Sequence, residues 1–251
     1  MSDCYDLDRI VSTTRIEGIL RNETPLRIGS GRAQVFTSLT DNPVLTLGDK
    51  PVIPGSTLKG VLRSLAEAYM RSQETNKGEN NEGENNVIYK VYDLKEREEP
   101  SCKEVNNKRI YCIPCILFGF HDISSRVFLF DAVIEGNYSI SMRTMVTINR
   151  VFGGQHAGHL YTLDFVDPGA SFKFNMIINN LDIINGEKEE WKNKAVEVMR
   201  YLLKTLVNDG VFVGGRKSVG YGLVKLVEGR VSFRTLSSSS EKDLKELISS
   251  W

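Results

Sequence analysis

The sequence predicts an α+β fold, because strand-like segments and two amphipathic helical segments follow one another in the order β-α-β-β-α-β. This is the order of the ferredoxin-like or RRM-like unit, in which two helices pack on one face of an antiparallel sheet. The length is the second observation, since 251 residues, 41% of them hydrophobic, suit a single elaborated domain over 1–251. The third is that no apolar run approaches the about 18–20 residues of a membrane helix. We therefore expect a globular domain in the cytoplasm with no membrane partner.

The first strand and helix are clear in the sequence. Residues 10–20 (IVSTTRIEGIL) are rich in β-branched residues and roughly alternate, which predicts a strand. A Gly- and Pro-punctuated stretch then leads to the helix, with Pro54-Gly55 as the entry turn and Ser56 or Thr57 as the N-cap. The apolar stripe of this helix recurs at i, i+3, i+4, i+7 and i+11 and consists of Leu58, Val61, Leu62, Leu65 and Tyr69.

The later elements complete the unit. Strands are predicted at 126–134, near 143–149, at 171–178 and at 223–233. The second helix ends near Asn208-Asp209-Gly210, and its apolar face consists of Trp191, Ala195, Val198, Leu202 and Leu206. The glycines between the middle strands predict a projecting hairpin or loop. Leu244, Leu247 and Ile248 predict a short terminal helix after a linker at 237–240.

Residues 73–125 interrupt the pattern and predict an insertion. Its part 73–104 holds nine acidic and five basic residues, and 73–86 has no apolar residue, so we expect a mobile acidic loop. Cys112 and Cys115 form a CxxC knuckle, with Cys102 before it and His121 after it. Three thiolates and one imidazole suit structural zinc, and the insertion has little other apolar material to order it. We expect a zinc knuckle, with Cys4, another residue or water as alternatives to His121; two redox-inert buried cysteines are the competing interpretation.

Two segments carry groups suited to anions. The start of the first helix combines free backbone N–H groups with polar and cationic side chains, those of Ser56, Lys59 and Arg63. We expect Lys59 and Arg63 to face solvent. The loop 214–222 (GGRKSVGYG) allows close backbone approach at Gly214 and Gly215, supplies charge at Arg216, and offers Tyr221 for stacking on a base. A capped surface helix and a flexible turn are the alternatives.

Three motifs together resemble the RAMP superfamily of CRISPR systems over roughly residues 10–230. They are IPGSTLKGVLRS (53–64), CIPCILFG followed by SSRVFLFDA (112–132), and GGRKSVGYGLVKL (214–226). The resemblance is strongest to the repeated backbone subunit of type III (Csm-type) effector complexes. That family carries an Asp in a context like IDSPVI before the helix motif. LTDNPVL stands in the same place here, so Asp41, which alone would be a turn former, is identified by resemblance as the catalytic residue.

The resemblance implies an RNA-binding assembly. Copies of the chain, with other type III effector subunits, line CRISPR guide RNA, and each copy's Asp cuts guide-paired target RNA beside a projecting thumb hairpin. The thumb maps to about 148–167 and includes Phe152. The implied guide contacts are Ser56, Lys59, Arg63, Phe152, Gly214, Gly215 and Arg216.

Three functions remain open from the sequence. In the first, the chain is a metal-dependent endoribonuclease in which Asp41 binds Mg²⁺ or positions the attacking ribose 2′-hydroxyl. In the second, it is a non-cleaving structural subunit that organises guide RNA. The third, a guide-processing endonuclease, generally needs histidine in the site, and the only loose candidates are His156 and His159.

Overall fold

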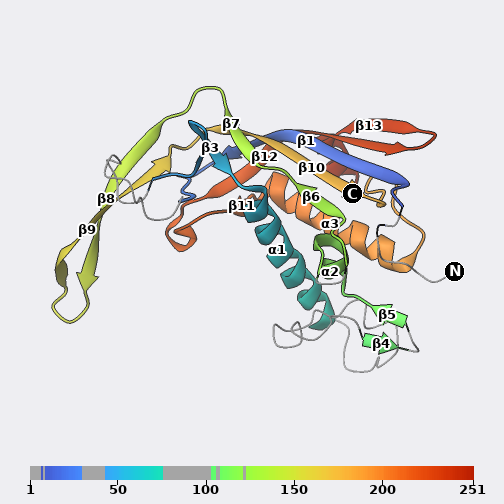
Figure 1. The fold of residues 1–251 in the computed structure, drawn as a ribbon, viewed down its shortest axis with the longest axis horizontal. Coiled ribbons are helices and arrows are strands. Elements are labelled where there is room, and N and C mark those ends of the chain that lie inside the picture. The colour runs from blue at the N-terminus through green and yellow to red at the C-terminus, as the bar shows by residue number, and fades with distance from the viewer. Residues whose placement is uncertain (1–6, 8, 30–42, 76–102, 106–107, 121–122) are drawn as a thin grey trace.

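The computed structural model describes residues 7, 9–29, 43–75, 103–105, 108–120 and 123–251. Its centre is an antiparallel sheet in the order β12–β1–β10–β6/β7 (Figure 1). The bounds of these strands are β1 Ser12–Asn22, β6 Val127–Leu129, β7 Ala132–Glu135, β10 Ser171–Asn179 and β12 Leu223–Thr235. This order places the fourth, first, third and second strands of the predicted β-α-β-β-α-β unit side by side, which confirms a mixed α+β fold with antiparallel pairing.

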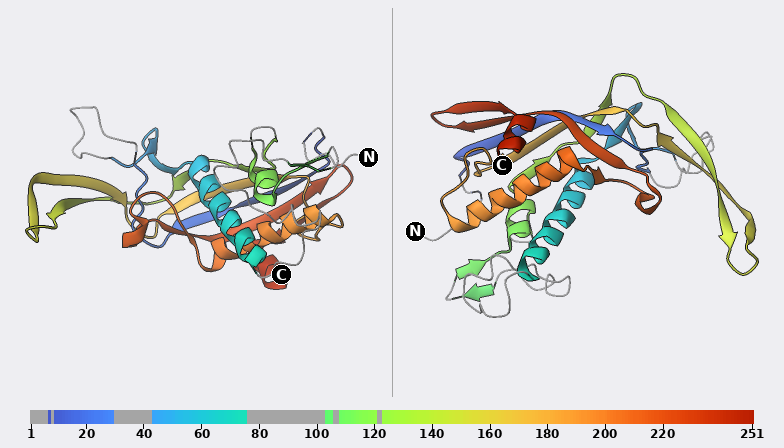
Figure 2. Two further views of the ribbon diagram at one scale, coloured as in Figure 1. Left: turned by 90° about the horizontal axis from the view of Figure 1, so that it is seen from below. Right: turned by 180° about the vertical axis from the view of Figure 1, so that it is seen from behind.

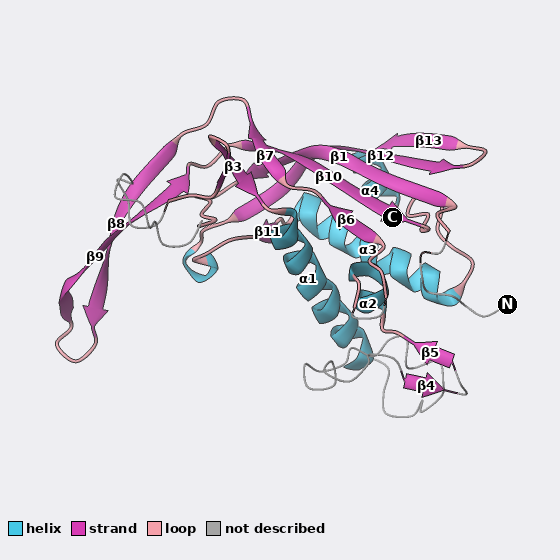
Figure 3. Cartoon of the chain, in the orientation of Figure 1, coloured by secondary structure: helices cyan, strands magenta, loops and turns pink. Residues whose placement is uncertain are grey.

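The helices form a second layer on one face of this sheet. Figures 1 and 3 show α1, α2 and α3 below the sheet, and Figure 2 shows α4 beside α3 in the view from behind. Their bounds are α1 Gly55–Thr75, α2 Ile113–Phe118, α3 Glu190–Asn208 and α4 Leu244–Ser250. No helix in the described ranges is long and apolar enough to cross a membrane.

The hydrophobic core lies between the two layers. Along β1, Thr14, Ile16 and Leu20 are buried, whereas Arg15 and Glu17 between them are exposed, as the period of a half-buried strand requires. The expected faces of both helices are confirmed, because every predicted apolar residue of α3 is buried and α1 buries Leu58, Leu62, Ala66 and Met70, with Val61, Leu65 and Tyr69 packed against the core.

The prediction of a single strand at 126–134 is wrong in one respect. The segment is broken into β6 and β7 by Phe130 and Asp131. The break allows the Asp131 carboxylate to accept a hydrogen bond of 2.8 Å from the Gly55 backbone N–H, at the start of α1. The helix therefore begins at Gly55, before both predicted N-caps, Ser56 and Thr57, and the carboxylate of another element satisfies its first N–H.

A long two-stranded hairpin projects from one end of the sheet (Figure 1). It consists of β8 (Ile140–Asn149) and β9 (Gly154–Val166), which pair with each other along their length. The expected hairpin is confirmed, but it begins at Ile140 and not near 148. Its register shifts between Val146 and Ile148, so β9 carries extra residues at that point.

The remaining strands extend the sheet or form small pairs. They are β2 Thr46–Leu47, β3 Lys50–Ile53, β4 Lys103–Val105, β5 Lys108–Ile110, β11 Val211–Phe212 and β13 Ser239–Asp243. The prediction of a linker at 237–240 is partly wrong, since β13 begins at Ser239 and pairs with β12.

The segment 73–125 contributes to the core more than its composition indicated. α1 continues into it as far as Thr75, and all residues from Tyr111 to Phe118 are buried. The expectation that this segment has little apolar material to order it is therefore wrong for 111–118. The acidic residues 76–102 lie outside the described residues.

Candidate nucleic-acid interface

The glycine-rich loop is held against the segment that follows β1. The Gly215 N–H donates to the Arg27 carbonyl at 2.9 Å, and the Gly222 N–H donates to the Pro25 carbonyl at 2.9 Å. A Cβ on Gly214 would lie 2.2 Å from the Arg27 oxygen, and its φ of +75° also favours glycine. The glycine at 214 is therefore required by the close approach of two backbones.

Positive charge gathers where this loop meets the hairpin. Arg216 has a left-handed backbone, with φ 61°, and its guanidinium donates to the Tyr161 hydroxyl of β9. Burial lowers the pKa of Arg27, and the nearby charge of Arg216 lowers it further, while Asp164 opposes the shift. Two guanidiniums close enough to repel one another form a favourable environment for a phosphate group.

Tyr221 does not occupy the position expected for a base-stacking residue. Only 5% of its surface is exposed, and its ring packs edge-on against Phe165 with the centroids 5.8 Å apart. Its hydroxyl accepts a hydrogen bond of 2.7 Å from Arg143 of β8. The prediction that Tyr221 stacks on a base is therefore wrong, and its ring belongs to the junction between loop and hairpin.

The functional candidates that sequence reasoning missed are Arg27, Arg143 and Tyr161. Arg27 falls in the irregular stretch after β1, and the other two lie in the hairpin, which carries few charges. Nothing in their local sequence distinguishes them, because their meeting depends on contacts between segments more than 50 residues apart in the chain, such as Arg216 with Tyr161.

Asp41 falls in 30–42, outside the described residues. The described residues on either side of that segment pair with each other: the Leu45 N–H donates to the Ile28 carbonyl at 2.7 Å, and Gly29 and Val44 form an antiparallel bridge. Both ends of the segment that carries Asp41 are therefore anchored next to Arg27.

The first turns of α1 differ from the expected anion site. Ser56 is exposed, but Lys59 donates to the Ser125 hydroxyl at 2.9 Å, and burial, followed by the charge of Arg63, lowers the pKa of Lys59. Arg63 pairs with Glu67 at 3.0 Å and donates to the Gly119 carbonyl at 2.8 Å. The expectation that Lys59 and Arg63 face solvent is therefore wrong, because both hold α1 against the segment around α2.

This arrangement predicts a stability role for Arg63. Arg63→Ala is expected to lower the free energy of unfolding by about 1–3 kcal/mol, because it leaves the Gly119 carbonyl and the Glu67 carboxylate without their cationic partner. Arg71→Ala, at an exposed arginine of the same helix, is the matched control and should change it by less than about 0.5 kcal/mol. Urea unfolding of both variants measures the difference, and equal losses would contradict the interpretation.

The turn of the hairpin presents an aromatic side chain. Val151 and Phe152 are each 85% exposed, and the Asn149 side-chain oxygen accepts their N–H groups at 2.9 and 3.3 Å. The turn is thus fixed locally although its apolar side chains are in water. An exposed phenylalanine on a fixed turn is suited to insertion between bases. His156 lies nearby on β9 and is exposed, whereas the side chain of His159 is outside the described part.

The cysteine pair lies at the start of α2. Cys112 and Cys115 are 2% and 1% exposed, and their sulfur atoms are 2.9 Å apart. The hydrogen bond to Cys115, together with burial, raises the pKa of the Cys112 thiol above its usual range. Cys102 and His121 lie outside the described residues, and within the described ranges no group of three potential ligands occurs. The two thiols face one another, and two thiolates on one tetrahedral zinc would lie about 3.8 Å apart, so zinc binding would require this pair to open.

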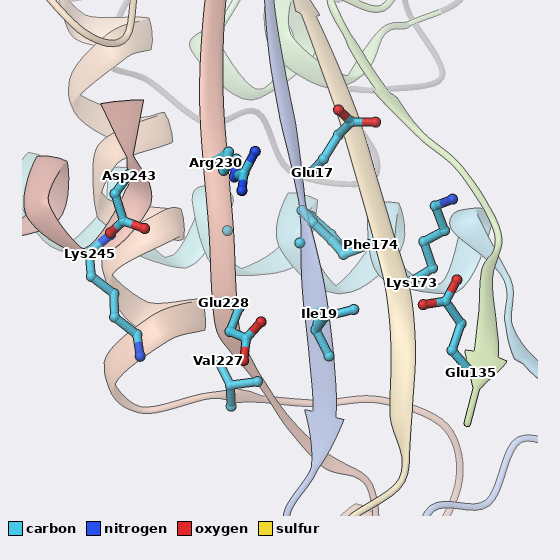
Figure 4. Close-up of a pocket in the computed structure, with 12 residues that line it drawn as sticks. Glu17, Ile19, Glu135, Lys173, Phe174, Val227, Glu228, Arg230, Asp243 and Lys245 are labelled. Atoms are coloured by element: carbon cyan, nitrogen blue, oxygen red, sulfur yellow. The ribbon is translucent and has the colours of Figure 1, made fainter. Parts of the chain in front are cut away.

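The open face of the sheet carries a separate hollow (Figure 4). Its charged lining has both signs and comprises Glu17, Glu135, Lys173, Glu228, Arg230, Asp243 and Lys245. Among the described residues that line it, none belongs to the loop 214–222, the start of α1 or the hairpin tip. The mixed charge does not favour a polyanion, so this hollow is not part of the candidate interface.

Comparison with known proteins supports the assignment from sequence motifs. The family model described as the RAMP superfamily matches residues 19–225. The protein named CRISPR system Cms endoribonuclease Csm3, from Methanocaldococcus jannaschii, is 28% identical over 223 residues, which cover 84% of this chain and 77% of that protein. The family model runs from the end of β1 to the start of β12 and includes the hairpin and the glycine-rich loop.

Proposed function

Because the chain belongs to the RAMP superfamily, we propose that it is the repeated backbone subunit of a type III CRISPR effector complex that binds guide RNA and cuts guide-paired target RNA. The observation that carries this proposal is the junction of the glycine-rich loop with the hairpin. There, Arg27 and Arg216 concentrate positive charge beside the anchored ends of the segment that holds Asp41. The Csm3 relative is named as an endoribonuclease, which supports the cleavage part.

The proposed guide contacts rest on the positions of these side chains at the junction, the hairpin tip and the start of α1. Arg27 and Arg216 contact phosphates, and the glycines at 214 and 215 allow the RNA backbone to approach the loop. Phe152 stacks on or separates bases at the tip of the hairpin. Ser56, exposed in the first turn of α1, is a further polar contact. Lys59 and Arg63 are assigned to the packing of α1, because their hydrogen bonds join that helix to the Ser125 hydroxyl and the Gly119 carbonyl.

The proposed cleavage uses one carboxylate of the protein and the RNA itself. Asp41 supplies the carboxylate, and the ribose 2′-hydroxyl next to the scissile phosphate is the nucleophile. Its oxygen bonds to phosphorus as the bond to the 5′-oxygen of the next nucleotide breaks, and the proton that the 2′-hydroxyl loses is balanced by one that the leaving 5′-oxygen gains. Mg²⁺, when bound, neutralises charge that develops on the phosphate. DNA lacks the nucleophile, so a target with a single 2′-deoxy sugar at the scissile position should not be cut there.

The test is reconstitution of the complex with guide RNA, its partner subunits and a labelled target. We expect a ladder of regularly spaced products in Mg²⁺ from the RNA target and none from a DNA target of the same sequence. Guide affinity should fall with salt, in proportion to the number of phosphates that each subunit neutralises. A complex that binds guide and target yet never cuts would leave the structural, non-cleaving role.

We also propose that Cys112 and Cys115 supply two ligands of a structural zinc ion, with Cys102 and His121 as the other candidates. Cys112→Ser should lose the bound zinc, as measured by metal content in mass spectrometry, and should destabilise α2, which is part of the core. Cys4→Ser and His121→Ala then distinguish the two candidates for the fourth ligand, since only the variant of the true ligand should weaken zinc binding. Equal zinc content in the Cys112→Ser variant and the wild type would exclude this site.

A further inference from the structure

The hairpin is attached to the domain mainly at its base. There, Val166 and Leu26 exchange backbone hydrogen bonds of 2.8 and 2.9 Å, and the Asn22 side chain donates to the Asp167 carbonyl at 2.9 Å. β8 and β9 otherwise pair with each other and form their own sheet. A two-stranded ribbon that is fixed at one end can bend and swing about that end.

Two reciprocal contacts between hairpin and loop lie further out along the ribbon. Arg216 of the loop donates to the Tyr161 hydroxyl of β9, and its guanidinium carbon is 5.6 Å from the centre of that ring. In the opposite direction, Arg143 of β8 donates to the Tyr221 hydroxyl of the loop at 2.7 Å. We name these two arginine–tyrosine contacts the brace.

The packing around the brace restricts its movement. The Arg143 guanidinium also lies over the ring of Phe165, 5.4 Å from its centre, and Tyr221 packs edge-on against that same ring. Arg216 holds a left-handed backbone conformation, with φ 61°, that is unfavourable for a non-glycine residue. A residue kept in such a conformation indicates a constraint from function or from its surroundings.

The brace contacts the ribbon at a point well away from its base. Tyr161 is five residues from Val166 along β9, or about 17 Å at about 3.3 Å per residue. The buried side chains of Leu163 and Phe165 hold the ribbon near its base, and a second attachment at this distance narrows its exit angle further.

We infer that the brace fixes the angle of the hairpin relative to the loop 214–222 and thereby sets the position at which bound RNA is cut. This inference rests on the proposed function. The exposed aromatic tip at Phe152 contacts RNA in that proposal, and the loop holds the guide backbone. The angle between them determines which nucleotide the hairpin meets. Tyr161 and Tyr221 are thus positioning residues that act through the hairpin, not catalytic residues.

The variants that test the brace remove only hydroxyl groups. The double variant Tyr161→Phe/Tyr221→Phe deletes both acceptors of the arginine N–H groups but keeps both rings, so the packing on Phe165 is retained. Tyr69→Phe is the matched control, because the Tyr69 hydroxyl donates to Glu197 at 2.7 Å in the helix layer, away from the hairpin.

The first measurement is hydrogen–deuterium exchange of the isolated chain. We expect the amides of Leu26 and Val166, whose hydrogen bonds join the base of the hairpin to the domain, to exchange about tenfold faster in the double variant, with those of β1 and β10 unchanged. Unchanged exchange of these two amides would overturn the brace. This measurement needs no RNA, so it decides on the brace even if the wild-type complex proves not to cut, an outcome that would overturn the proposed function alone.

The second measurement is the distribution of cut positions in the reconstituted complex. In the double variant, the share of products cut at neighbouring phosphates should rise about fivefold over wild type, with guide affinity and total yield retained. If the two tyrosine hydroxyls served folding alone, the double variant would give less product at every cut position, and the cut positions themselves would not change. Wild-type cut positions in a double variant whose hairpin exchanges faster would overturn the link between the angle and the cut site.

Discussion

Gly55→Ala is expected to lower the free energy of unfolding by about 3 kcal/mol or more. A Cβ at this position would lie 2.3 Å from the Leu129 carbonyl oxygen and 2.9 Å from backbone carbon atoms of Leu129 and Phe130. These are main-chain atoms between β6 and β7, so they cannot rotate away as a side chain can. Relief requires α1 to move from the sheet, which also breaks the hydrogen bond from the Gly55 N–H to Asp131.

Gly60→Ala is the matched control on the same helix. No atom outside the helix lies within 4 Å of a Cβ there, so alanine should stabilise the protein by about 0.5–1 kcal/mol through its better helix propensity. Urea unfolding and thermal melting of the two variants measure the contrast. Similar stability of Gly55→Ala and Gly60→Ala would show that α1 does not approach the sheet as described.

Asp41→Ala is expected to abolish or greatly reduce cutting at every site that this subunit contributes. In the proposed reaction its carboxylate has no replacement, and the loss of one essential group in a metal-assisted reaction lowers the rate by orders of magnitude. Folding, zinc content, assembly and target binding should remain close to wild type. The measurement is the product ladder of the reconstituted complex in Mg²⁺.

Two further variants sharpen this experiment. Asp41→Asn keeps the shape but removes the charge, and should fail almost as badly. Asp49→Ala changes an exposed aspartate in the turn between β2 and β3 and should cut normally. Full cleavage by an assembled Asp41→Ala complex would remove this residue from catalysis and favour the structural role.

The sequence predicted the parts of the fold that depend on periodicity. The face of α3 was correct because each of its apolar residues contacts the core, and β1 was correct because its alternation matches a sheet with one face covered. The break between β6 and β7 was missed, since Phe130 continues an apolar run that resumes directly after Asp131, and a single Asp does not mark the end of a strand. Asp131 leaves the strand because its carboxylate accepts a hydrogen bond from the Gly55 N–H at the start of α1.

The candidate site was less predictable, because it depends on tertiary contacts that leave no periodic pattern in the sequence. The glycines at 214 and 215 could be identified because glycine marks close backbone approach. Whether an arginine packs within the domain or reaches the hairpin could not be predicted, since nothing in the sequence distinguishes Arg63 from Arg216. Arg63 is used in packing α1, whereas Arg216 reaches the hairpin, and this difference arises from tertiary contacts. Asp41 was identified by resemblance to a family motif and stays a prediction.

The hairpin is separate from the main sheet, so the length of the hairpin can change independently of that sheet. β8 and β9 add no strand to the sheet over the helices, so residues near the tip can be inserted or removed without disturbing the core. One added residue in each strand extends the hairpin by about 3.4 Å, and steps of two in each strand also keep every side chain on its original face. The hairpin can therefore serve as a ruler whose reach is adjusted independently of the domain that carries it.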